Sequence, residues 1–162
     1  MRWLLERRAQ TMASGVVAVL LLIVIASALV DGLHLLSTRQ RCLEIASAAA
    51  LRGTSRGRDY ARYLVTGQIG LDPIVASDEA TSAADAALAA LGLSGYTIWV
   101  EVLDAPGGGS MADFPPGQTW METEPTVGVY LEAPVETVFL QVVNGNSPVT
   151  LHVFAAAGVT TE

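Results

Sequence analysis

The chain has 162 residues, enough for one modest domain, and its formal net charge is −7. All nine basic residues are arginines at or before Arg62, and from Tyr63 onward the chain has twelve acidic residues and no basic one. A long acidic segment without lysine or arginine excludes an electrostatic surface for nucleic acid. The single cysteine, Cys42, excludes an intrachain disulfide.

A basic lead at residues 1–11 precedes an uncharged apolar run at residues 12–30. The nineteen residues of this run form a helix of roughly 30 Å, which is the thickness of a bilayer's hydrocarbon core. The run therefore predicts a single transmembrane helix. A cleaved signal peptide is the alternative, because Ala26-Ser27-Ala28 has the small residues of a cleavage site. The apolar run is longer than the usual core of a signal peptide, which favours a retained anchor.

Arginines flank the span on both sides, so the positive-inside rule gives only a modest bias. The arginines of the lead, Arg7 and Arg8 above all, lie closest to the lipid boundary. The acidic C-terminal part is easy to translocate because it lacks nearby lysine and arginine. We therefore expect a single-pass protein of the cytoplasmic membrane, with its N-terminus in the cytoplasm and its C-terminal domain outside.

Small residues and one acid make the span a candidate surface for other helices. Gly15 and Ala18 lie on its early turns, and small residues let helices approach closely in lipid. Asp31 follows the span directly. It either reaches the water interface or, within lipid, pairs with a partner such as an arginine of a neighbouring chain.

The helical pattern continues through residues 31–53, which contain no proline and end at Gly53, a typical C-terminal stop. Ala46 and Ala50 lie close to one face of this extension. Because the whole helix is too long to be covered by a small domain, we expect it to be the surface for helix packing and assembly. The predicted packing and assembly residues are Gly15, Ala18, Asp31, Ala46 and Ala50.

Residues 54–76 are predicted to be a linker with one helical turn at residues 59–66. Its arginines and tyrosines predict a solvated turn that pairs with the acidic domain or with lipid headgroups. A helix is predicted at residues 77–91, with Ser77 or Asp78 as its N-cap and Gly92 as its left-handed C-cap.

Alternation of apolar and polar residues predicts an antiparallel sheet in the C-terminal part of the chain. The predicted strands are residues 96–103, 126–132, 137–143 and 149–155. Pro134 is expected to end the second strand, and Asn144-Gly145 to form a hairpin turn. With the preceding helix these strands predict a small α+β domain at residues 77–162.

The long loop at residues 104–125 contains the large apolar residues Met111, Phe114 and Trp120. They either dock a partner or fold back over the sheet. His34 and His152 lie more than a hundred residues apart, and no phosphate-binding or calcium-binding spacing occurs. We therefore expect a non-catalytic protein with no metal, no cofactor and no small-molecule substrate.

Several features of the first third of the chain occur together: the basic pair Arg7-Arg8, the apolar span, the dyad Asp31-Gly32, the arginines Arg39 and Arg41, and the alanine-rich run at residues 46–50. This arrangement resembles the N-terminal region of TadE/TadG-like proteins of the tight-adherence (Tad, or Flp) pilus system. The later order of an alanine-rich helix, a strand ending in Pro/Gly-rich sequence and a last short strand also fits. The resemblance implies a pilin-like fold and a membrane-anchored minor pilin or accessory component, with the lipid bilayer and other pilus components as partners.

Processed pilins of this kind carry a glutamate five residues into the mature helix, and no such glutamate occurs from Ala9 to Val30. The departure fits the unprocessed, TadG-like branch better than an ordinary filament subunit. A second class of function stays open. The chain is alternatively a single-span accessory subunit, with a structural role, of a larger membrane complex such as a respiratory or photosynthetic one.

Overall fold

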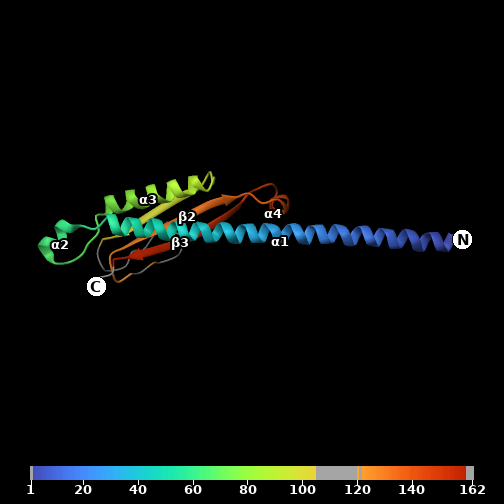
Figure 1. Ribbon diagram of the computed structural model, residues 1–162, viewed down its shortest axis with the longest axis horizontal. Helices are drawn as coiled ribbons and strands as arrows, with labels where there is room; N and C mark the ends of the chain where they lie inside the picture. Colours follow the sequence, from blue (N-terminus) through green and yellow to red (C-terminus); the bar gives the residue numbers. More distant parts are fainter. Residues whose placement is uncertain (1, 105–119, 121, 160–162) are drawn as a thin grey trace. The chain divides into compact units, whose positions relative to one another are not determined.

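The computed structural model describes residues 2–104, 120 and 122–159, with side chains from residue 14 onward. In chain order the elements are α1 (Arg2–Arg56), α2 (Tyr60–Thr66), α3 (Pro73–Ala90), β1 (Thr97–Leu103), β2 (Thr126–Val135), α4 (Phe139–Val143) and β3 (Val149–Gly158) (Figure 1). They form two compact units, Met1–Ser37 with Glu136–Val149, and Thr38–Val135 with Thr150–Glu162. The fold is α+β, as predicted.

α1 is one uninterrupted helix of 55 residues. Among the described residues it is the one helix that is long and apolar enough to cross a membrane. Every side chain from Ser14 to Ala26 is exposed, including large ones such as Leu20 and Ile23. An exposed apolar surface of this length is unfavourable in water, and lipid satisfies it. The structure thus supports the predicted span at residues 12–30.

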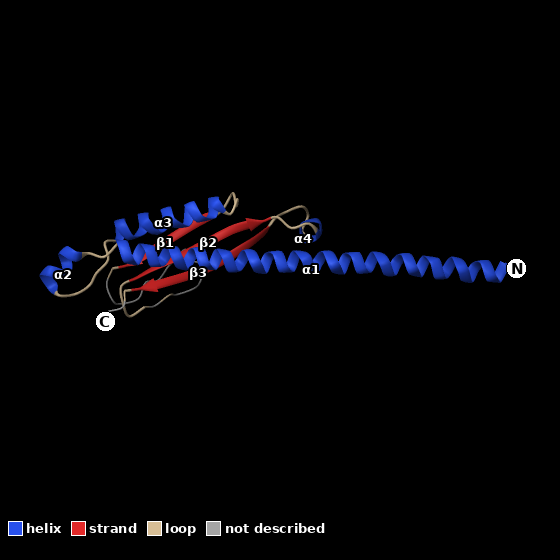
Figure 2. Ribbon diagram, viewed as in Figure 1, coloured by secondary structure: helices blue, strands red, loops and turns tan. Residues whose placement is uncertain are grey.

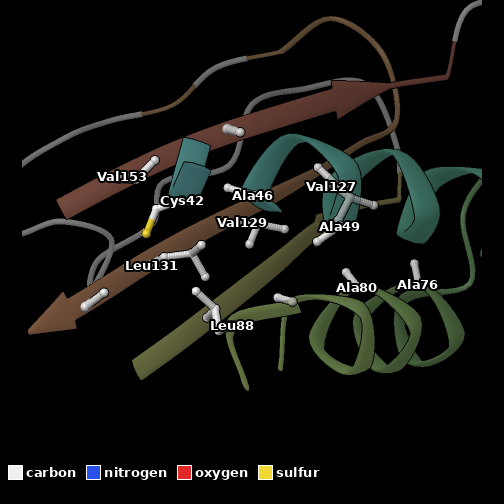
Figure 3. Close-up of a cluster of buried hydrophobic side chains, with 14 of the residues drawn as sticks. Cys42, Ala46, Ala49, Ala76, Ala80, Leu88, Val127, Val129, Leu131 and Val153 are labelled. Atoms are coloured by element: carbon white, nitrogen blue, oxygen red, sulfur yellow. The ribbon is translucent and has the colours of Figure 1, made fainter. Parts of the chain in front are cut away.

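The second unit contains a three-stranded antiparallel sheet in the order β1-β2-β3 (Figure 2). In the register of the first two strands, Trp99 lies opposite Tyr130 and Val100 lies opposite Val129. The C-terminal part of α1 and all of α3 cover one face of this sheet. Figure 3 shows the core between them, to which the labelled residues of α1, α3, β2 and β3 all contribute. The fully buried core residues of β2 are Val127, Val129, Leu131 and Ala133.

α1 and α3 pack closely because the side chains between them are small. The fully buried alanines are Ala46 and Ala50 of α1 and Ala76, Ala80 and Ala84 of α3. A Cβ atom on Gly53 would lie 2.8 Å from the backbone oxygen of Ala76, and one on Gly57 would overlap Ala76 itself. The predicted helix stop at Gly53 is therefore wrong by three residues. Gly53 lies inside α1, and its missing side chain lets α3 approach.

α3 begins at Pro73, four residues before the predicted start at Ser77. Its N-cap is Asp72, whose carboxylate accepts the backbone N–H groups of Ile74 at 3.0 Å and Val75 at 3.2 Å. Proline is favoured at the first helical position, where no intrahelical N–H bond is lost. The sequence analysis missed this start because Ser77 and the acid after it also have the chemistry of an N-cap.

Two other local predictions agree with the structure. α2 occupies the predicted helical turn, and the carboxylate of Asp59 caps it by accepting the backbone N–H of Arg62 at 2.9 Å. Gly92 adopts a left-handed φ of 73° after α3, as its predicted capping role requires. Arg62 also lies 3.7 Å from Asp104, which agrees with a linker arginine pairing with the acidic part of the chain.

The prediction of a strand at residues 137–143 is wrong, because that segment contains the short helix α4. The amides at its start bond to Asp31 of α1 instead of to a neighbouring strand. Asn144-Gly145 follows this helix in the connection between β2 and β3, so the two residues do not form the predicted tight hairpin turn. β2 also continues through Pro134, which lies beyond Glu132, the last β2 residue paired with β1.

The folded domain is also larger than the predicted range of residues 77–162. Residues 42–50 of the predicted helical extension contribute Cys42 and three alanines to the core. Leu71, in the predicted linker, is 2% exposed and belongs to the same core. The C-terminal third of α1 is thus an internal element of the domain.

Substitution Gly57→Ala tests the close packing of the two helices. We expect a loss of about 1–3 kcal/mol in the free energy of unfolding, because the new methyl group displaces Ala76. Gly32→Ala is the matched control, since nothing lies within 4 Å of its added Cβ atom. It should leave stability unchanged or raise it by up to about 1 kcal/mol through helix propensity. Thermal unfolding followed by circular dichroism in mild detergent measures both, and equal midpoints for the two variants would contradict the packing argument.

Candidate functional site at the end of the apolar span

Asp31 is the first residue after the apolar span, and its side chain is directed at the start of α4. Its Oδ1 atom accepts the backbone N–H of Val138 at 3.1 Å. Its Oδ2 atom accepts those of Phe139 at 2.7 Å and Leu140 at 2.9 Å. The residue is 4% exposed. One carboxylate on α1 therefore satisfies three backbone donors of a helix more than a hundred residues later in the chain.

The first turn of any helix has N–H groups without intrahelical acceptors, and a side chain close in sequence usually supplies them. α4 lacks that arrangement, because its own N-cap residue is Val138, which has no side-chain acceptor. Asp31 performs the capping role from a different element. Its negative charge also lies at the positive end of the α4 backbone dipoles.

Hydrogen bonds to the ionised carboxylate lower the pKa of Asp31 below its ordinary value of 3.8. The bond from Leu140 has the largest effect, burial opposes it, and the bonds from Val138 and Phe139 lower the pKa further. Because the folded pKa is the lower one, the stabilisation by this cap is present above the unfolded pKa. It is lost as the pH falls through the folded pKa.

The sequence left two roles open for Asp31, contact with the water interface or pairing with an arginine of another chain. In the structure Asp31 instead caps α4. Its acceptors are used by α4 of the same chain, so an arginine from a neighbouring chain is not required. This contact was not predicted because residues 137–143 were assigned to a strand, so no helix start that needs a cap was expected there. Thr137 lies directly before Val138, the N-cap residue, but its hydroxyl does not cap α4.

The other predicted assembly residues fall into two groups. Gly15 and Ala18 are exposed on the apolar part of α1, and no atom lies within 4 Å of a Cβ added at Gly15. Ala46 and Ala50 are 0% exposed in the core of the chain's own domain. Both of these alanines pack against elements of the same chain, so the structure accounts for their small size without a partner protein.

A polar cluster on the opposite face of the sheet was not predicted. The hydroxyl of Tyr130 lies 2.7 Å from Nδ1 of His152, and the same nitrogen lies 3.2 Å from Oε1 of Glu132. Nδ1 accepts from the tyrosine when it carries no proton, and donates to the glutamate when it does. Tyr130 and Glu132 are two residues apart and so share a strand face. The position of His152 depends on strand pairing, which the sequence does not specify.

Aromatic residues surround this cluster, and one of them, Trp120, belongs to the long loop at residues 104–125. Trp120 lies edge-on to Phe154 at 5.8 Å, and Trp99 packs on Tyr130 at 5.4 Å, both measured between ring centroids. Trp120 therefore folds back over the sheet. Met111 and Phe114 lie outside the described residues.

Within the described part of the chain, no group of three or more His, Cys, Asp and Glu side chains is placed to hold a metal ion. Cys42 is a free, buried thiol, and burial raises its pKa. Comparison of the chain with protein-family models, with curated proteins and with solved structures finds no match.

Substitution of Asp31 should release α4. We expect Asp31→Ala to lower the hydrogen-exchange protection of the amides of residues 138–140 on the order of five- to thirty-fold, because three donors lose their acceptor. The parent should keep its protection from neutral pH down to the region of the ordinary aspartate pKa and lose it below, whereas Asp31→Asn should show no such transition. Protection factors of the full-length protein in detergent, corrected for intrinsic exchange, measure both effects. Unchanged protection in Asp31→Ala would show that α4 forms without this cap.

Proposed function

We propose that the protein is a non-catalytic, membrane-anchored minor pilin or accessory component of a Tad-type pilus assembly system. The proposal rests on α1, one helix with an exposed apolar part and a part buried in the domain. Its N-terminal part exposes large apolar side chains, and its C-terminal part lies in the core of an α+β domain without any break in the helix. One helix is thus both anchor and structural core, the arrangement that the resemblance to TadE/TadG-like proteins implies.

A structural role is supported by the contacts of the ionisable side chains, which cap helices and form an ion pair. Asp31, Asp59 and Asp72 each cap a helix by accepting backbone N–H groups. Arg52 pairs with Glu79 at 2.9 Å across the surface of α1 and α3. Such contacts hold the elements of the domain in place.

We infer that the domain lies outside the cytoplasm, because no basic residue after Arg62 opposes its export. Protease added to spheroplasts of cells expressing the full-length chain should therefore remove the C-terminal domain, detected through a C-terminal tag. A cytoplasmic protein in the same cells is the control for intact membranes. Protection of the tag equal to that control would contradict the proposed orientation.

We propose further that the assembly surface is on the apolar part of α1. Gly15 and Ala18 remain exposed there, whereas Ala46 and Ala50 are buried in the core of the chain's own domain. Helices in lipid associate through close packing, which small residues permit. A leucine in place of Ala18 keeps the span apolar but separates the two helix backbones.

Native co-purification from mild detergent tests this assembly surface. Ala18→Leu should reduce recovery of partner proteins several-fold, and Val19→Leu, which adds a leucine on a different side of the same turn, should not. Circular dichroism of both variants checks that the domain stays folded. Equal recovery with both variants would place the contacts elsewhere. Pilus-assembly proteins among the partners would support the proposal, whereas subunits of a respiratory or photosynthetic complex would support the alternative of an accessory subunit there.

A further inference from the structure

α4 lies at the level where the apolar span ends. Asp31, which holds its first amides, immediately follows Val30, the last residue of the span. Figure 1 shows α4 beside α1, and both belong to the same compact unit there. Side-chain exposure along α1 also changes at this level, because Ser27 and Ala28 are half-buried after thirteen consecutive exposed residues from Ser14 to Ala26. The segment around α4 is therefore fixed next to the lipid boundary.

This segment exposes three valines beside uncharged polar residues such as Asn144 and Asn146, and the exposed acid Glu136 directly precedes it. Val138 is 80% exposed, and Val142 and Val143 are each 70% exposed. Residues 137–149 contain no ionisable side chain, although the chain after Tyr63 has twelve acids. Exposed valines with no acid between them suit the interfacial layer of a membrane, where charges near the hydrocarbon are costly and apolar groups are stabilised.

We propose that residues 137–149 form a second membrane contact, in which α4 inserts its exposed valines into the interfacial layer of the bilayer that α1 crosses. The occupant of this surface is lipid, because the surface is continuous with the span through the Asp31 cap. The contact also explains why an aspartate at the lipid edge is buried under three amide donors, which replace water around its charge.

Fluorescent labelling of the full-length protein tests the contact. A Cys42→Ala background removes the buried native thiol, and single cysteines at Val142, at Val65 and at Leu21 carry an environment-sensitive NBD label. Val65 lies on α2 and is 86% exposed, so it is the water-exposed control. Leu21, inside the span, is the deep control. The variants are reconstituted in phosphatidylcholine vesicles at low protein-to-lipid ratio, and circular dichroism checks their folding.

We expect the label at Val142 to emit at shorter wavelength than the label at Val65, with iodide quenching several-fold weaker. Lipids with a spin label near the headgroup should quench it more than lipids labelled deep in the chain, and Leu21 should show the reverse order. Iodide quenching at Val142 equal to that at Val65 would overturn the proposal. Shielding that disappears as the protein is diluted in lipid would also overturn it, in favour of a second copy of the chain.

Asp31→Ala in the labelled Val142 protein separates this contact from the anchor itself. Release of α4 should restore iodide quenching at Val142 and leave the label at Leu21 unchanged. Shielding that survives the loss of Asp31 would overturn the role of the cap in holding α4 at the membrane. These measurements need no pilus component, so they can succeed or fail independently of the proposed assembly function.

Discussion

The domain depends on the close approach of two helices that pack on each other largely through alanine and glycine. Alanine and glycine bury little apolar area each, so the stability of such an interface comes from dense contact along its whole length and from the larger residues beneath it. Leu88, Leu131 and the valines of β2 fill that lower layer. If α1 were displaced outward, these side chains would be exposed together. The position of the helix therefore decides whether the sheet has a core at all.

The aspartates of this chain illustrate how a protein with few basic residues uses its acids. Asp59 and Asp72 accept amides two or three residues ahead of them, and Asp31 accepts amides of a remote helix. In each case the negative charge lies at the positive end of a helix, so no arginine or lysine is required to compensate it. An acidic chain can in this way remain folded with only a few ion pairs.

The sequence predicted most elements whose signals are local, and most of its errors lie where a distant residue determines the structure. The uncharged run at residues 12–30 and the alternation in β1 and in the first part of β2 were sufficient for the anchor and the α+β class. The start of α3 was misplaced because two sets of capping residues follow one another. α4 was misread because Asp31 supplies its cap, and Ala46 and Ala50 were assigned to a partner because their actual neighbours lie on α3 and the sheet. The cluster around His152 could not be found without the order of the strands.

The tie between Asp31 and α4 also sets an order of events during synthesis. Asp31 and the amide of Val138 are separated by 107 residues. At roughly 5–20 residues per second, the carboxylate waits about 5–20 s for its partners after it is made. During that interval the carboxylate of Asp31 lacks these three amide donors. Contacts between residues so far apart form late, because the intervening chain must be ordered first. The contact between Asp31 and α4 is consequently completed only after most of the domain has been synthesised.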